Sequence, residues 1–322
     1  MMRVLVLLCL CFTICVGQNR RCSSPSNEDI KPCTCMQDSG NRLYIYCEGL
    51  SSLDELRSAV KGMKNLKIDT LELSKSNIGT LPADIFKDVE IQILTIKFTT
   101  LTSLSESLNR PPYLGLESSL EKIEIRDCFI DDSNPLTRLS FAHLKKLTVI
   151  QLEGNIIPTI GNDMFESGPY GVKELYLLQT DPKILGSHAF SSLPNLRKIS
   201  LTGGAFTQIS RKVFPEPATF LESIDLSNNK LASTPVDLFT RMPSLNEVLF
   251  DNNNLITINE ISFAPVWTQL RHAFFYGNPL DCNQNMKWIF QYRLPESLRG
   301  HCAAPPDLRG ATLTNLTLTD FN

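Results

Sequence analysis

Side chains able to carry out catalysis are sparse in this chain of 322 residues. Its four histidines are His143, His188, His272 and His301, and no two of them have the spacing of a zinc site. The sequence also lacks a G-x-S-x-G turn, a phosphate-binding loop and a dinucleotide fingerprint. Residues 251–254 lack the glycine and the distal glutamate that a calcium loop needs. We therefore expect a protein that is not an enzyme and that holds no metal and no cofactor.

The N-terminus has the features of a secretory signal peptide. One arginine is followed by an apolar stretch, residues 4–16, and then by Gly17 and a polar run. This stretch is too short for a membrane span, and we predict cleavage after Gly17. The polar residues 317–322 do not resemble a glycolipid-anchor signal. We expect a secreted, extracellular protein with no membrane span and no anchor.

Seven of the ten cysteines follow the predicted signal peptide, and six of these are grouped towards the two ends of the chain. The grouped cysteines are Cys22, Cys33, Cys35, Cys47, Cys282 and Cys302, and Cys128 stands alone. In an oxidising compartment such groups predict disulfide-bonded caps. Spacing alone does not choose among the three possible pairings of the first four. Zinc is disfavoured because Cys33-x-Cys35 has one intervening residue, whereas structural zinc sites usually have two to four.

A repeated pattern, L-x-x-L-x-L-x-x-N-x-L, must position these residues, and its clearest copies are residues 221–231 and 245–255. The repeats begin at Ile68, Ile91, Leu120, Leu147, Val172, Leu196, Leu221, Leu245 and Leu270. Their spacing of 23–29 residues is typical of a leucine-rich repeat, whose neighbours must stack to bury their apolar edges. Alternating apolar residues indicate one strand per repeat. The sequence predicts an α/β solenoid, a leucine-rich-repeat horseshoe with a parallel concave sheet and disulfide-bonded N- and C-terminal caps.

Two further positions support this register. An aromatic column inside the convex side is predicted because a phenylalanine follows the repeat start by eighteen residues in six repeats. These residues are Phe86, Phe165, Phe190, Phe214, Phe239 and Phe263, and Phe141 takes the same role if residues 131–134 are an insertion. The ninth position is Asn155, Asn229, Asn253 or Asn278 in the best copies, where the amide satisfies backbone groups as the chain leaves the strand. It is Ser76, Thr99, Cys128, Thr180 or Gly204 elsewhere, where we expect looser or water-filled turns, with Cys128 a buried thiol.

These patterns divide the chain into five parts. They are a signal peptide (1–17), an N-terminal cysteine cap (18–67), about nine leucine-rich repeats (68–280), a C-terminal cap (281–303) and a tail (304–322). Two repeats carry insertions, residues 105–116 and 131–134, which we expect to form loops. The tail contains a glycosylation sequon at Asn315, so we expect a glycoprotein.

The cap and repeat motifs resemble those of extracellular leucine-rich-repeat proteins over residues 22–302. The resemblance implies the pairings Cys22–Cys35 and Cys33–Cys47, and Cys282–Cys302 in a C-terminal cap that has two cysteines instead of the usual four. The overall plan, including a short free tail, is most similar to the arthropod group of the Oplophorus-luciferin 2-monooxygenase non-catalytic subunit. This likeness implies a secreted partner subunit without oxygenase chemistry of its own.

In such a fold the concave face is built from positions two, three, five, seven and eight of each repeat, and here positions five and seven carry two apolar groups on a polar background. The predicted partner contacts are Tyr176 and Leu178 in one group, Leu249, Phe274 and Tyr276 in the other, and the acidic residues Asp225 and Asp251. Exposed aromatic residues on a rigid surface are typical of binding sites, and acidic neighbours favour a basic partner. A competing interpretation is that the C-terminal cap covers Phe274 and Tyr276.

A rigid, curved face without catalytic motifs predicts a binding protein. We expect a secreted recognition scaffold or non-catalytic subunit that binds another extracellular protein, such as a secreted enzyme subunit, through its concave face. The alternatives are an extracellular-matrix or adhesion component, and an enzyme such as a hydrolase or an oxygenase. The net charge of −3 and the absence of long basic runs give no signature of nucleic-acid or heparin binding.

Overall fold

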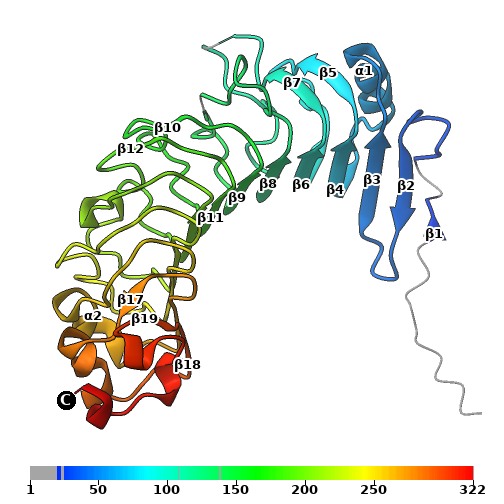
Figure 1. Ribbon diagram of the computed structural model, residues 1–322. Coiled ribbons are helices and arrows are strands. Elements are labelled where there is room, and N and C mark those ends of the chain that lie inside the picture. Colours follow the sequence, from blue (N-terminus) through cyan, green and yellow to red (C-terminus); the bar gives the residue numbers. More distant parts are fainter. Residues whose placement is uncertain (1–19, 23–24, 108, 138, 322) are drawn as a thin grey trace, which may run out of the picture.

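Short strands stack through most of the chain into one curved sheet. The computed structural model describes residues 20–22, 25–107, 109–137 and 139–321, so the predicted signal peptide lies outside the described residues. The main sheet contains, in spatial order, β1 (Arg20–Arg21), β2 (Thr34–Gln37), β3 (Leu43–Glu48), β4 (Lys67–Ser74), β6 (Glu90–Lys97), β8 (Lys122–Arg126), β9 (Val149–Glu153), β11 (Glu174–Leu178), β13 (Lys198–Thr202), β14 (Ser223–Asp225), β15 (Glu247–Leu249), β16 (His272–Phe274) and β18 (Ser297–Arg299). Figure 1 shows that this sheet lines the inner side of an arc. The predicted fold class is confirmed.

The repeat register sets how the strands pair. From β3 to β18 all neighbours are parallel. The fourth positions of successive repeats lie opposite one another, as Leu71 with Leu94 and Leu175 with Ile199 illustrate. The side chains at these positions are buried. Each repeat therefore buries its apolar edge against its neighbours, as a solenoid requires.

The outer side of the arc consists of short segments and turns (Figure 1). Three small sheets pair β5 (Asn77–Thr80) with β7 (Thr100–Ser103), β10 (Thr159–Ile160) with β12 (Ile184–Leu185), and β17 (Leu280–Asp281) with β19 (Cys302–Ala304). The helices within the described residues are α1 (Leu53–Gly62), α2 (Glu260–Trp267) and five 3-10 segments, Arg211–Val213, Gln284–Gln291, Pro306–Leu308, Leu313–Asn315 and Leu318–Phe321. α1 begins after Ser52, whose side chain accepts a hydrogen bond from the N–H of Glu55.

The predicted aromatic column is confirmed, and it contains one ring that the offset rule missed. The six phenylalanines at offset eighteen and Phe141 are all buried. The repeat that begins at Ile91 has no phenylalanine at this offset, and Tyr113 from its insertion takes the place. The ring centroid of Tyr113 lies 6.3 Å from that of Phe86 and 6.1 Å from that of Phe141. The column therefore continues through the irregular repeat.

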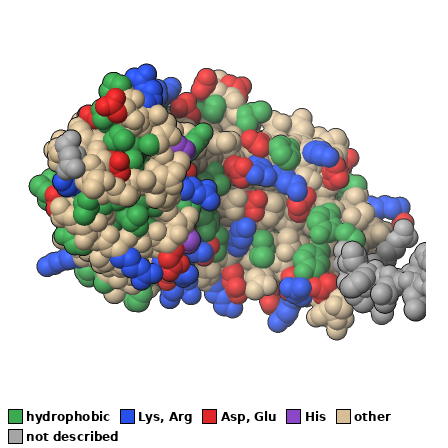
Figure 2. Space-filling model, turned by 60° about the horizontal axis from the view of Figure 1, so that its bottom comes forward, with side chains coloured by type: hydrophobic (Ala, Val, Ile, Leu, Met, Phe, Trp, Pro, Cys, Tyr) green, Lys and Arg blue, Asp and Glu red, His purple; other side chains and the backbone are tan. Residues whose placement is uncertain are grey.

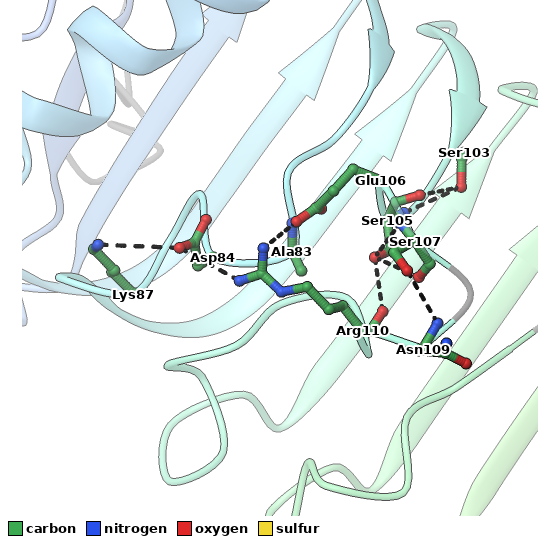
Figure 3. Close-up of polar contacts among 9 residues, drawn as sticks. All are labelled: Ala83, Asp84, Lys87, Ser103, Ser105, Glu106, Ser107, Asn109 and Arg110. Carbon is green, nitrogen blue, oxygen red and sulfur yellow. Dashed lines mark hydrogen bonds and ion pairs between the residues drawn. The ribbon is translucent and has the colours of Figure 1, made fainter.

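The insertion at residues 105–116 is tied to the preceding repeat, as Figure 3 shows. The carboxylate of Glu106 accepts a hydrogen bond from the N–H of Ala83 and pairs with Arg110. The guanidinium of Arg110 also lies 3.5 Å from the carboxylate of Asp84. The described residues of this insertion form neither helix nor strand, so the predicted loop is confirmed.

Asparagines at the ninth position join the backbone of neighbouring coils. Asn253 donates hydrogen bonds to the carbonyls of Leu226 (2.9 Å) and Phe250 (3.0 Å), and its side-chain oxygen accepts from the N–H of Leu231 (3.0 Å). At Thr180, one of the positions without asparagine, such side-chain bonds are missing within the described part of the chain. The buried hydroxyl of Thr180 has no hydrogen-bond partner among the described residues, which fits the looser turn predicted there.

Cys128 occupies a ninth position as a buried thiol, as predicted. It is the one free cysteine within the described ranges. Its N–H donates a hydrogen bond to the side-chain oxygen of Asn155 (3.0 Å), and its thiol lies 3.1 Å from the carbonyl oxygen of Arg126. Burial raises the pKa of the Cys128 thiol to about 11. The residue therefore replaces an asparagine structurally and is not activated as a nucleophile.

Both ends of the arc are closed by the predicted disulfide-bonded caps. The disulfides are Cys22–Cys35 and Cys33–Cys47 at the N-terminal end and Cys282–Cys302 at the C-terminal end. Each cap also adds a parallel strand, since β3 pairs with β4 and β18 pairs with β16. The sheet therefore extends beyond the nine repeats that the motif marks.

The segment after residue 304 is not the free tail that the overall plan of the sequence implies. Leu313 and Phe321 are buried, and the ring of Phe321 lies 5.1 Å from that of Phe290. The N–H of Leu313 donates a hydrogen bond to the carbonyl of Gly300 (3.0 Å). A solenoid end must be covered, and these side chains add to the single disulfide in covering it. Asn315 of the sequon is exposed in this segment.

Candidate binding face

The concave face presents positions five and seven of each strand, because alternate residues of a strand point to opposite faces. The register of the strands arranges these positions in rows that cross the sheet. One row at position five runs through Ser200, Asp225, Leu249, Phe274 and Arg299. Residues that are about 25 apart in the sequence thus become neighbours on a single surface.

Five of the seven predicted contacts lie together near the C-terminal end of the face. This group, the C-terminal patch, consists of Asp225, Leu249, Asp251, Phe274 and Tyr276. Leu249 lies between Asp225 and Phe274 in adjacent strands. The carboxylate of Asp251 accepts a hydrogen bond from the N–H of Tyr276 (2.6 Å), which joins the turns that follow β15 and β16. The patch therefore combines apolar and acidic side chains on a hydrogen-bonded frame.

The C-terminal cap reaches this patch but covers only part of it. The guanidinium carbon of Arg299 lies 4.2 Å from the ring centroid of Phe274, and the rings of Tyr276 and His301 meet edge to face at 5.4 Å. Phe274 is half-buried, while 56% of Tyr276 stays exposed. The interpretation that the cap covers both residues therefore holds in part for Phe274 and fails for Tyr276. Sequence reasoning missed Arg299 and His301 because the cap lies outside the repeat pattern.

The two aspartates of the patch, Asp225 and Asp251, accept hydrogen bonds from uncharged donors. Asp225 accepts hydrogen bonds from the hydroxyl of Ser200 (2.9 Å) and the N–H of Ser227 (2.9 Å). Burial raises the pKa of the half-buried Asp251 carboxyl above its ordinary value. Within the part of the chain that the structure describes, neither carboxylate forms an ion pair. Neither charge is therefore neutralised by a direct ion pair, while the guanidinium of Arg299 acts on Asp251 at longer range and partly offsets the effect of burial on its pKa.

The other predicted group, Tyr176 and Leu178, lies on β11 and is separate from the C-terminal patch. β13 stands between it and β14, which at a strand spacing of about 4.8 Å puts roughly 10 Å between the two groups. The hydroxyl of Tyr176 donates a hydrogen bond to Glu174 (2.8 Å), and burial raises the pKa of this tyrosine. The structure thus places all seven residues on one face but in two groups.

Farther towards the N-terminal end, the charges of the concave face are paired with one another. Lys97 lies 2.9 Å from Glu72, and Arg126 pairs with Glu153. Figure 2 shows positive and negative side chains interspersed on the hollowed side of the arc. Because these charges already neutralise each other, this part of the face offers a partner less net attraction than the C-terminal patch does.

Neither a metal centre nor a membrane segment is visible in the described part of the chain. Its His, Cys, Asp and Glu side chains form no group of three or more that could hold a metal ion. None of its helices combines the length and the apolar character that crossing a bilayer requires.

Several known proteins are similar in sequence to this chain. Toll-like receptor 9 of Mus musculus is 25% identical over 179 residues, which are 54% of this chain and 17% of the receptor. The CD180 antigen of Homo sapiens is 27% identical over 248 residues, which are 74% of this chain and 32% of that protein. The chain thus spans a third or less of the length of these two relatives. The Oplophorus-luciferin 2-monooxygenase non-catalytic subunit of Oplophorus gracilirostris is 23% identical over 92% of this chain and 87% of that subunit.

The fold is also found in a solved structure, an octameric complex of Latrophilin 3, Unc5D and FLRT2 (LRR). The similarity covers 87% of this chain and 88% of the matched chain, with a TM-score of 0.58 and 16% sequence identity. A family model described as "BspA type Leucine rich repeat region" matches residues 159–286 in six copies. Taken with the repeat spacing and the stacked parallel strands, these similarities identify the chain as a leucine-rich-repeat protein.

Proposed function

We propose that this chain is a secreted binding scaffold that holds another extracellular protein against its concave face and contributes no catalysis of its own. The observation that carries this proposal is the C-terminal patch, where Tyr276 is 56% exposed and is hydrogen-bonded through its N–H to Asp251, and where Asp225 and Asp251 form no ion pair within the described residues. Aromatic side chains on rigid surfaces anchor protein interfaces at a low cost in entropy. Acidic neighbours steer a basic partner towards them.

Two further observations support the secreted, non-catalytic part of the proposal. Three disulfides are typical of proteins that fold in an oxidising compartment. The similarity to a protein named a non-catalytic subunit extends over 92% of this chain. A secreted enzyme subunit is therefore the partner that we favour, and Asn315 is a glycosylation site in this proposal.

The partner is to be captured from the extracellular fluid of the source with the tagged protein and identified by mass spectrometry. A stoichiometric soluble protein supports the proposal. Collagen or proteoglycan would instead support a matrix or adhesion component, and turnover by the purified chain would show that it is an enzyme.

The Tyr276→Ala variant tests whether the captured partner uses the C-terminal patch. We expect its affinity to fall about thirtyfold, the loss typical of removing an aromatic anchor, with no change in folding because the side chain is mostly exposed. Surface plasmon resonance measures the affinity. Tyr170→Ala is the matched control, because Tyr170 is similarly exposed, at 54%, but does not belong to the patch. Equal effects of the two substitutions would exclude the patch as the contact surface.

A second variant, with both Tyr176 and Leu178 replaced by serine, tests the separate group on β11. Loss of binding with an unchanged circular dichroism spectrum would extend the interface across β13 to this group. Unchanged affinity would remove these two residues from the proposed interface.

A further inference from the structure

The eighth position of every repeat has a left-handed backbone, because the chain turns sharply where it leaves the strand. These residues are Lys75, Phe98, Asp127, Gly154, Gln179, Gly203, Asn228, Asn252 and Gly277, with φ between 48° and 73°. Glycine adopts this conformation without strain, and Asn and Asp tolerate it better than other residues do. A bulky residue with such a φ is an outlier. Phe98, at φ 50°, is the aromatic residue in this series.

The strain at Phe98 is not offset by burial of its ring, since half of the residue is exposed. Ile130, in the turn that follows the next strand, is 69% exposed. Between them lies an open hollow of about 500 Å³ at the ends of β6 and β8. The buried side chains of Leu101 and Phe129 also line it. We call this feature the Phe98 hollow. Its base is apolar because of Leu101 and Phe129, and the exposed side chains of Phe98 and Ile130 add apolar surface at its rim.

The charged residues that line the Phe98 hollow are both acidic, Asp127 and Asp131. The carboxylate of Asp131 accepts hydrogen bonds from the N–H and the hydroxyl of Ser133, both at 2.8 Å, and these bonds lower the pKa of Asp131. It therefore stays ionised and fixed in place. The neighbouring cations, Lys97 and Arg126, form ion pairs with Glu72 and Glu153 on the concave face and not with the aspartates of the hollow.

We propose that the Phe98 hollow is a second protein-binding site, which takes one bulky apolar side chain of an extracellular partner flanked by lysine or arginine. The apolar lining receives the side chain, and the ionised carboxylate of Asp131 in the lining receives a basic group. Removing two exposed apolar side chains from water favours this contact, and charge complementarity selects a basic segment over an acidic one. The hollow lies beyond the C-terminal ends of β6 and β8, and the strands β9, β11 and β13 separate it from β14, where the C-terminal patch begins.

The Phe98→Gly variant separates binding from folding. Glycine accepts φ 50° without strain, so we expect this variant to melt at the same temperature as the parent protein or higher. We expect it to lose affinity for the ligand about tenfold or more, because an aromatic contact is removed. Gln179→Gly is the matched control, since Gln179 has the same position and conformation in another repeat. Asp131→Asn keeps the acceptor for Ser133 but removes the charge, and we expect it to weaken binding about threefold at low salt only.

The probe is a short fluorescent peptide with one leucine between two arginines, titrated into the full chain and followed by fluorescence anisotropy. Two comparison peptides replace the arginines by glutamates or the leucine by serine, and we expect both to bind at least about tenfold more weakly. The Tyr276→Ala variant should bind the probe unchanged, which distinguishes the hollow from the C-terminal patch. Equal binding by Phe98→Gly and the parent protein would overturn the proposal, as would equal binding of the acidic peptide. A dimer of the parent protein that Phe98→Gly abolishes would show that a second copy of the chain is the occupant instead, and this too would overturn it.

Discussion

Cys128 shows how a single side chain replaces the asparagine of the motif. A thiol can neither donate two hydrogen bonds nor accept as strongly as an amide, so the backbone around it depends on Asn155 of the next coil. The pKa of the thiol is raised to about 11 from an ordinary 9.0, because burial disfavours the thiolate. Since the folded-state pKa is the higher one, the protonated thiol stabilises the fold fully below pH 9. This contribution is lost as the pH rises from 9 through 11.

At pH 8 we expect the thiol of Cys128 to react with an aromatic disulfide reagent about a hundredfold more slowly in the native protein than in urea, because so little of it is thiolate. The absorbance of the released aromatic thiol measures both rates. The cap disulfides stay intact, so one thiol per mature chain should react in urea. Native reactivity within about tenfold of the unfolded value would mean that the thiol is open to solvent, against its observed burial.

At the scale of strands and loops, the sequence predicts the features that the repeat pattern determines, which are the positions and the register of the strands. Each strand contains two buried positions at fixed spacing, so its register and the row from Asp225 to Phe274 follow from counting. Tyr113 could not be found in this way, because the length and path of the insertion decide which of its residues enters the column. The strand β18 could not be found in this way either, because it lies in the C-terminal cap, outside the repeat pattern that located the equally short β14, β15 and β16.

Tyr113 provides a test of that insertion, because its hydroxyl is buried without a hydrogen-bond partner among the described residues. Tyr113→Phe keeps the ring and removes the unpaired hydroxyl, so we expect a free energy of unfolding that is unchanged or raised by about 1 kcal/mol. Tyr113→Ala leaves a cavity in the aromatic column and should lower it by about 3–5 kcal/mol. Urea denaturation measures both variants. A large loss in Tyr113→Phe would show that the hydroxyl is satisfied after all, for example by an ordered water.

At the scale of the whole molecule, stability is a sum of contacts between neighbouring coils. Every strand of the sheet from β3 to β16 touches only the strand before it and the strand after it in the stack. No strand pairing within the described ranges joins the two ends of the array, so we expect a local loss of structure at one end to extend only as far as neighbouring coils stabilise each other. The caps therefore protect the adjacent strands first, and the C-terminal patch depends on the cap that supplies Arg299 and His301.

Replacing Cys282 and Cys302 by serine should therefore loosen β16 and β18 while β4 to β9 stay ordered. A disulfide of this kind contributes about 2–4 kcal/mol, and its loss acts here on the last coils of the stack. Hydrogen–deuterium exchange followed by mass spectrometry resolves the two ends. We expect faster exchange at the C-terminal end and, with it, a loss of partner binding at the C-terminal patch.

The matched control removes the disulfide at the opposite end, with Cys33 and Cys47 replaced by serine. It should raise exchange in β3 and β4 and leave binding at the C-terminal patch intact, because nine strands of the sheet lie between β3 and β18. A uniform rise in exchange along the whole arc in either variant would contradict this expectation. The chain would then unfold as one cooperative unit, and the cap would support the binding face only through global stability.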